Sequence, residues 1–157
     1  MPKTTICLWF DHEGEEAAEF YTSLFPNSRV TDTSRYGDGG PGQSGAVMTV
    51  AFELDGASFV ALNGGPAHAS FTEAISVQID CADQAEVDHY WNAFAEGGEE
   101  SQCGWIKDRF GLSWQVVPRA LPELLGSPDP EVAARVMAAM MEMQKLEVAD
   151  LELAARS

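Results

Sequence analysis

One strand–helix unit occurs twice in this sequence, and the repeat limits the possible folds more than any other feature. Ile6–Phe25 can be laid over Ile75–Phe94 without a gap. The overlay pairs like residues on the strand, at the turn and on the helix face: Ile6 with Ile75, Leu8 with Val77, Phe10 with Ile79, Asp11 with Asp80, Tyr21 with Tyr90 and Phe25 with Phe94. A looser match links Gly56–Phe59 to Gly111–Trp114. Two matches in the same order indicate two related halves.

The other elements follow from hydrophobic periodicity and from turn residues. The predicted strands are Thr5–Phe10, Arg29–Tyr36, Ala46–Leu54, Ser58–Leu62, Ala74–Ile79, Trp105–Lys107 and Ser113–Val117. The predicted helices are Gly14–Phe25, Asp83–Ala95, Leu121–Leu125 and Pro130–Lys145, with a last amphipathic turn or two over Leu146–Ala155. Asp55-Gly56 predicts a tight hairpin turn between two of the strands.

These elements predict one α+β domain over residues 1–157, since a chain of this length can bury a core without disulfides or metals. Two βαβββ modules, at about 4–66 and 71–118, would each form a curved antiparallel sheet with a helix on one face. The two sheets would surround a shared cleft. Further helices would follow at about 120–155.

The charge and the cysteines restrict the partners. Acidic residues outnumber basic residues by 25 to 9, so the net charge is −16 and repels nucleic acid and anionic lipid surfaces. No apolar run approaches the ~20 residues that cross a bilayer. The first residues lead directly into a strand pattern, and the three cysteines form no CxxC pair. We therefore expect a cytoplasmic protein that contacts neither nucleic acid nor membrane.

The alternation of side chains along a strand predicts which residues line the cleft. Leu8 and Phe10 are apolar and should face the helix, so Cys7 and Trp9 should face the other way. The same rule applies to the strands of the second half, and polar residues at strand ends add to the set. Together they predict a cleft lining that is partly polar and largely uncharged, which suits a small-molecule ligand. The candidate ligand-binding residues are Cys7, Trp9, Asn63, Ser76, Gln78, Trp105 and Gln115.

Six segments carry a resemblance to a known family: Leu8–Asp11, Glu16–Tyr21, Leu24–Ser28, Phe59–Gly65, Cys103–Trp105 and Asp108–Pro118. They are similar to the PhnB-like group of the vicinal-oxygen-chelate superfamily, which includes glyoxalase I, bleomycin-resistance proteins and extradiol dioxygenases. The group carries the domain label 3-demethylubiquinone-9 3-methyltransferase. The resemblance extends from Thr4 to about Met143.

The resemblance implies metal ligands on the inner faces of the first, fourth, fifth and last strands. The corresponding positions are Thr5 or Cys7, Val60 or Ala61, Ala74 or Ser76, and Gln115. Only Gln115 resembles a family ligand, and an amide oxygen alone binds metals weakly. We therefore expect no metal ion and no cofactor at this site.

The methyltransferase label lacks support in the residues, because no glycine-rich turn leads from a strand into a helix. Gly37–Gly45 is glycine-rich but leads into a strand, and it predicts either a mobile lip over the cleft or a plain hairpin loop. Two functions stay open. One is a protein that sequesters a small aromatic or quinone-like molecule without metal. The other is an enzyme, either a metal-dependent lyase or dioxygenase or a 3-demethylubiquinone 3-methyltransferase.

The remaining candidates have structural interpretations. His12, His68 and His89 are scattered and should lie on the surface, while the matched Asp11 and Asp80 suit helix capping. The helix predicted from Pro130 carries a wide apolar band: Val132, Val136, Met137, Met140, Met141 and Met143. This band could cover the chain's own sheet or equally dock on a second copy, since methionine-rich surfaces adapt to partners. Because the superfamily commonly forms dimers, we expect a homodimer.

Overall fold

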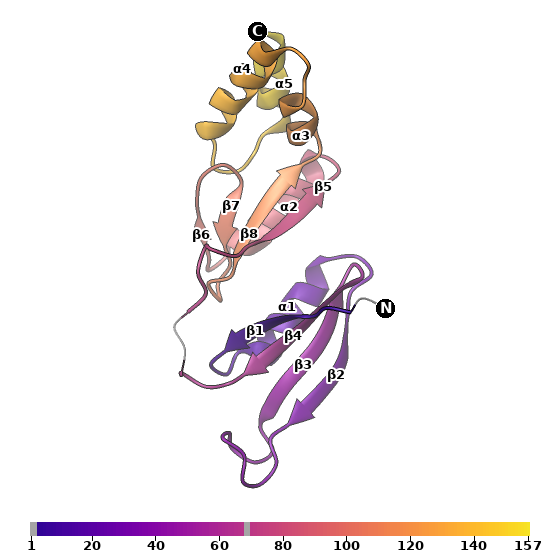
Figure 1. Ribbon diagram of the computed structural model, residues 1–157, viewed down its shortest axis with the longest axis vertical. Helices are drawn as coiled ribbons and strands as arrows, with labels where there is room; N and C mark the ends of the chain where they lie inside the picture. The colour runs from indigo at the N-terminus through magenta and orange to yellow at the C-terminus, as the bar shows by residue number, and fades with distance from the viewer. Residues whose placement is uncertain (1–2, 68–69) are drawn as a thin grey trace. The chain divides into compact units, whose positions relative to one another are not determined.

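The computed structural model describes residues 3–67 and 70–157. The chain forms two compact units, Met1–Ser70 and Phe71–Ser157 (Figure 1). Unit one contains β1 (Ile6–Phe10), α1 (Gly14–Leu24), β2 (Arg29–Arg35), β3 (Val47–Leu54) and β4 (Ala57–Asn63). Unit two contains β5 (Val77–Cys81), α2 (Gln84–Ala95), β6 (Glu99–Glu100), β7 (Trp105–Lys107), β8 (Ser113–Pro118), α3 (Ala120–Leu125), α4 (Pro130–Met141) and α5 (Val148–Arg156).

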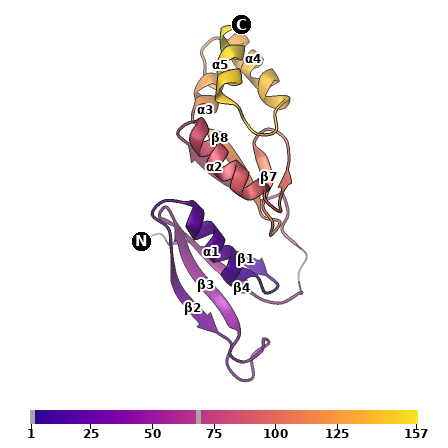
Figure 2. The same ribbon diagram turned by 180° about the vertical axis from the view of Figure 1, so that it is seen from behind.

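The sheet of unit one has the strand order β1-β4-β3-β2, and α1 covers one of its faces (Figures 1 and 2). Tyr21 of α1 is fully buried against this face, where Phe52 stacks on Phe59 with ring centroids 5.3 Å apart. Asp55 and Gly56 both have positive φ, at 46° and 89°, as the tight β3–β4 turn requires. In the described part of unit one, no helix covers the sheet face away from α1, which is its open face.

Unit two repeats this plan with the strand order β5-β8-β7-β6 and α2 on one face (Figure 2). Trp114 of β8 is 1% exposed and stacks on Phe94 of α2, with ring centroids 4.6 Å apart. Phe59 and Trp114 therefore occupy equivalent places in the two cores, as the match between Gly56–Phe59 and Gly111–Trp114 predicts. The α+β class and the duplicated plan are confirmed.

Both sheets are mixed, so the prediction of wholly antiparallel sheets was wrong. β1 pairs in parallel with β4, and β5 pairs in parallel with β8. In unit one, the crossover through α1 returns the chain to the far edge in the direction of β1. Two antiparallel steps then bring β4 beside β1 with that same direction.

In the first strand of each half, the gap-free overlay is two residues out of step with the strand pairing, whereas on the helices it pairs buried Tyr21 with buried Tyr90. Ile6 lies opposite Phe59, whereas the residue opposite Trp114 is Val77 and not Ile75. Accordingly, β5 occupies Val77–Cys81 instead of the predicted Ala74–Ile79. Because side chains alternate with a period of two, the shift leaves the predicted faces unchanged. Leu8 and Phe10 are buried, and only Ile6 at the strand end is exposed, by 43%.

The helix starts do not use the matched aspartates, so that prediction was wrong. The backbone N–H of Gly14 donates to Oδ1 of Asn63 at 2.7 Å, which leaves Asp11 out of the start of α1. α2 is capped by Asp83, whose carboxylate accepts from the N–H of Glu86 at 3.0 Å. Asp80 instead forms an exposed ion pair with Arg119 at 3.0 Å.

The C-terminal helices have a small core of their own, formed by Leu121, Val136, Leu146 and Leu151. The predicted helix Pro130–Lys145 is too long, because α4 ends at Met141. The N–H groups of Cys103 and Gly104 donate to the carbonyls of Met143 and Gln144, both at 2.8 Å. Those carbonyls are therefore withdrawn from a helix. None of the helices in the described part of the chain has the length and apolar character needed to cross a membrane.

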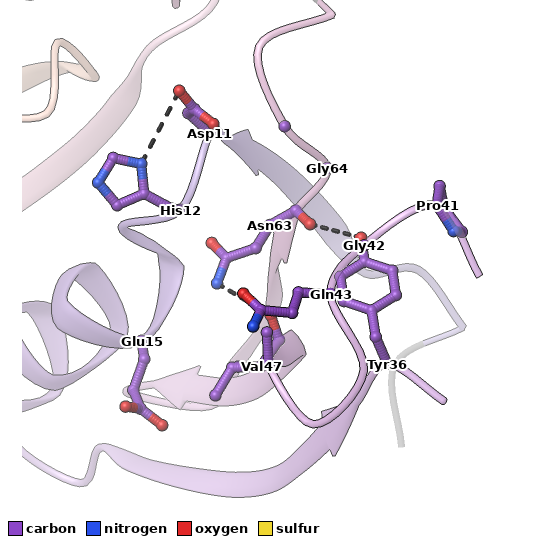
Figure 3. A pocket seen from close by; sticks show the side chains of 12 residues that line it. Asp11, His12, Glu15, Tyr36, Pro41, Gly42, Gln43, Val47, Asn63 and Gly64 are labelled. Carbon is purple, nitrogen blue, oxygen red and sulfur yellow. Dashed lines mark hydrogen bonds and ion pairs between the residues drawn. The ribbon is translucent and has the colours of Figure 1, made fainter. Parts of the chain in front are cut away.

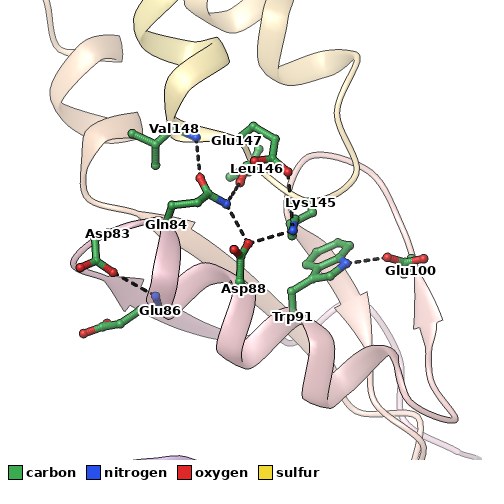
Figure 4. A network of polar contacts seen from close by, with 10 residues as sticks. All are labelled: Asp83, Gln84, Glu86, Asp88, Trp91, Glu100, Lys145, Leu146, Glu147 and Val148. Carbon is green, nitrogen blue, oxygen red and sulfur yellow. Dashed lines mark hydrogen bonds and ion pairs between the residues drawn. The ribbon is translucent and has the colours of Figure 1, made fainter.

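A polar network joins α2 to the segment before α5 (Figure 4). The side-chain amide of Gln84 accepts from the N–H of Val148 at 2.7 Å and donates to the carbonyl of Leu146 at 3.1 Å. Lys145 forms an ion pair with Asp88 at 2.8 Å, and its ammonium lowers the pKa of the Asp88 carboxyl. These contacts attach the C-terminal helices to α2 within unit two.

Candidate functional site

The open face of unit one presents Trp9 in a fixed orientation. Its indole N–H donates to the carbonyl of Gly65 at 2.9 Å. The ring lies on Gly64, where a Cβ atom would overlap the indole. Glycine is therefore required at this position by the approach of the ring. Cys7 lies two residues earlier on the same face of β1.

An apolar hollow of about 480 Å³ lies beside this indole. Its walls are Trp9, Tyr36, Pro41, Met48, Leu62 and Gly64, and its rim includes Arg35 and Asp38. Leu62 is the neighbour of Trp9 across the β1–β4 pair, so both side chains lie on the open face. Flat aromatic and aliphatic walls with few polar groups are typical of small-molecule sites.

A second, more polar hollow of about 340 Å³ shares Tyr36, Pro41 and Gly64 with the first (Figure 3). Asp11, His12, Glu15, Gln43 and Asn63 also line it. The Tyr36 hydroxyl donates to the backbone carbonyl of Asn63 at 2.6 Å, which fixes the ring between the two hollows. The loop after Tyr36 closes as a hairpin, with the Gly45 N–H bonded to the Tyr36 carbonyl at 2.8 Å.

Asn63 has a structural use in addition to lining this hollow. Its Oδ1 accepts from the N–H of Gly14 at 2.7 Å, and its Nδ2 donates to the carbonyl of Val47 at 3.2 Å. The side chain thus joins the start of α1 to the start of β3. Its role in binding a ligand stays a prediction.

Unit two brings four of the predicted residues together on the open face of its sheet. Gln115 of β8 lies between Gln78 of β5 and Trp105 of β7 in the strand register. Its Nε2 donates to Oγ of Ser76 at 3.0 Å. This row of amides and a hydroxyl offers hydrogen bonds but no general base that works near neutral pH. Its ligand-binding role stays a prediction.

Several lining residues were missed by sequence reasoning, among them Tyr36, Pro41, Met48 and Leu62. The position of Leu62 in the lining could have been predicted from the alternation of side chains along β4, if Leu62 had been paired with Trp9 of β1. Met48 lies at an irregularity of the β2–β3 pair, where Arg35 pairs with Val47 and Ser34 with Thr49. Such a bulge leaves no clear sequence signal. Tyr36 was identifiable only as the aromatic residue directly before the glycine-rich loop.

Burial and exposure distinguish the cysteines and histidines that the structure describes. Burial raises the pKa of the Cys81 thiol to about 12, with further contributions from the Glu86 and Asp80 carboxylates. Partial desolvation also raises the pKa of the Cys7 thiol. Both shifts disfavour the nucleophilic thiolate. His12 is 80% exposed and His89 is exposed, as predicted, while His68 lies outside the described residues.

The residues present do not fit the divalent metal that the superfamily resemblance implies. Across residues 3–67 and 70–157, no three His, Cys, Asp or Glu side chains meet in a way that would hold a metal ion. The open faces carry a thiol, a hydroxyl and amides at the expected positions. A methyl-donor cofactor fits no better, because the glycine-rich loop joins β2 to β3 and places no helix start on a ligand.

The comparisons with known proteins agree with this fold. The family model described as 3-demethylubiquinone-9 3-methyltransferase matches residues 2–117. A PhnB protein structure from Bacillus cereus is 34% identical, with 74% of this chain and 99% of that chain covered at a TM-score of 0.69. Protein PA1353 from Pseudomonas aeruginosa is 21% identical, with 75% and 98% covered at a TM-score of 0.62.

A glyoxalase/bleomycin resistance protein from Albidiferax ferrireducens T118 is more distant, at 11% identity and a TM-score of 0.49, with 73% of this chain and 96% of that chain covered. No curated protein matches the chain. The matched range ends before α3, so the three C-terminal helices lie outside it.

Proposed function

The chain belongs to the family described as 3-demethylubiquinone-9 3-methyltransferase, of PhnB-like proteins, and from this premise we propose that it binds a small aromatic or quinone-like molecule without a metal ion. The observation that carries the proposal is the fixed indole of Trp9 beside an apolar hollow of about 480 Å³. A flat ligand gains most from a flat wall that is already oriented, because little side-chain freedom is lost on binding.

The residues of this chain do not support the methyltransferase activity that the family description names. Methyl transfer from a nucleotide-type donor needs a site for that donor, and the glycine-rich segment is a strand-to-strand hairpin. The open faces supply hydroxyls, amides and indoles, which bind and orient a neutral molecule. Sequestration of a ligand is therefore the function that these side chains support best.

Two substitutions at the hollow test the proposal with duroquinone, a fully methylated quinone whose ring has no free position for thiol addition. Trp9→Leu removes the flat wall and is expected to weaken binding by about two- to tenfold, since aromatic contacts contribute about 0.5–1.5 kcal/mol beyond area burial. Gly64→Ala keeps the indole but displaces it, because the new Cβ overlaps the ring. A similar loss is expected. Calorimetric titration in the presence of EDTA measures both.

Val30→Ala is the matched control, because Val30 is a 39% exposed apolar residue of the same unit outside the hollow. Its affinity for duroquinone should equal that of the wild type. Circular dichroism verifies that each variant is folded. Absence of a binding heat for the wild type in these EDTA-containing titrations would contradict a metal-free aromatic site.

We also propose that the chain forms a homodimer through α4 and that it works in the cytoplasm. Met137 and Met141 lie one turn apart on α4 and are 43% and 57% exposed. Light scattering is expected to give a dimer mass at micromolar concentration, and Met137→Glu combined with Met141→Glu should give a monomer. A monomeric wild type would contradict this interface.

The proposed location in the cytoplasm is supported by the cysteines. Cys7, Cys81 and Cys103 are free thiols, as expected in a reducing compartment.

A further inference from the structure

One buried hydroxyl in unit two has no hydrogen-bond partner. Ser113 of β8 is 1% exposed, and its Oγ is the single buried side-chain oxygen or nitrogen in the described part of the chain that lacks one. Burying a hydroxyl without a partner is unfavourable, so such groups are rare in folded proteins. A group of this kind indicates a partner that is supplied from outside the chain.

Ser113 lines a small cavity of about 70 Å³. Ser113 pairs with Lys107 across β7 and β8, and both line the cavity together with Glu73, Glu99, Ser101 and Trp105. One water molecule needs only about 10–15 Å³ of such space, so the cavity is large enough for an oxygen substituent. The ring of such a ligand can lie against the wall formed by Trp105.

The charges around the cavity limit the substituent. Lys107 forms an ion pair with Glu73, and the carboxylates of Glu73 and Glu99 outnumber this one ammonium group. Hydrogen bonding to Glu73 raises the pKa of Lys107, so the ammonium remains a donor at neutral pH. An anionic group would be repelled by the two carboxylates, whereas a neutral oxygen can accept from the ammonium and bond to the Ser113 hydroxyl.

We propose that this cavity binds the hydroxyl group of a small neutral phenol-type ligand, with its oxygen at Ser113 and Lys107 and its ring on Trp105. The site lies wholly within unit two and does not depend on the ligand proposed for unit one. Ser113 would then make the site specific for ligands that carry a hydroxyl group. An analogue without that group would leave the buried Ser113 hydroxyl unpaired and would bind more weakly.

Phenol and toluene test the proposal, because they share a ring and differ in the oxygen. Both are titrated into the full chain, and nitrogen–proton NMR follows the backbone amides of Trp105 and Lys107, which report on this site and not on unit one. The wild type is expected to bind phenol about tenfold more tightly than toluene. Ser113→Ala should reduce this preference to about twofold or less while toluene binding is kept.

Ser113→Ala should also fold at least as stably as the wild type, because it removes an unpaired buried group. Ser157→Ala is the matched control, since it deletes an exposed hydroxyl at the end of α5. Trp105→Leu should weaken the binding of both probes equally. Equal wild-type affinities for phenol and toluene would overturn the proposal, as would a preference for phenol that survives Ser113→Ala or probe binding that is unaffected by Trp105→Leu.

Discussion

Asp108→Ala is expected to lower the free energy of unfolding by about 3–5 kcal/mol. Asp108 is 3% exposed. One carboxylate oxygen accepts from the N–H groups of Phe110 and Leu112 at 2.9 and 3.1 Å, and the other accepts from the Trp114 indole N–H at 2.9 Å. Alanine would leave these donors buried without their acceptor.

Urea unfolding followed by tryptophan fluorescence measures this loss. Asp108→Asn should have an intermediate effect, because one amide oxygen can still accept while the NH₂ group faces a donor. Asp80→Ala is the control, since it removes an exposed carboxylate whose ion pair with Arg119 is screened by water and should contribute little to stability. Similar losses for Asp108→Ala and Asp80→Ala would show that the buried carboxylate does not organise the β7–β8 turn.

Leu146→Ala is expected to lower the free energy of unfolding by about 2–5 kcal/mol and to loosen the C-terminal helices. Leu146 is fully buried and packs on Gly104, where a Cβ would lie 2.9 Å from its Cδ1. Its carbonyl also accepts from Gln84. The truncated side chain therefore leaves a cavity at the point where the helices join the rest of unit two.

Hydrogen exchange identifies where the stability is lost. Amides of α4 and α5 should exchange faster in Leu146→Ala, while those of β3 and β4 in unit one keep their protection. Leu153→Ala is the control, because Leu153 of α5 is 57% exposed and its truncation should change stability by less than about 0.5 kcal/mol. Unchanged exchange in α4 and α5 would mean that Leu146 does not anchor them.

Local periodicity was sufficient to predict the fold class and the faces of the strands. Leu8 and Phe10 alternate with Cys7 and Trp9, and this contrast alone assigned the core side of β1 correctly. Pairing direction could not be predicted in the same way. Whether β4 runs parallel or antiparallel to β1 depends on the path of the whole chain, which no local pattern records.

The hollow beside Trp9 depends on contacts between residues far apart in the sequence. The indole is fixed by Gly64 and Gly65, more than fifty positions away. Tyr36 is held by the carbonyl of Asn63. Asn63 itself was predicted at the mouth of a site, and its bond to Gly14 became visible only in the structure. Polar residues at strand ends suit ligand binding and helix capping equally well in a sequence.

The two-residue displacement between the halves has a consequence for how such a duplicated protein can diverge. A deletion or insertion of one residue within β1 or β5 would rotate every following side chain of that strand to the opposite side and expose the core. A change of two residues preserves inside and outside. Insertions and deletions in these strands should therefore change their length by an even number of residues. An alignment of relatives that assumes a constant spacing between the halves would then misplace equivalent residues.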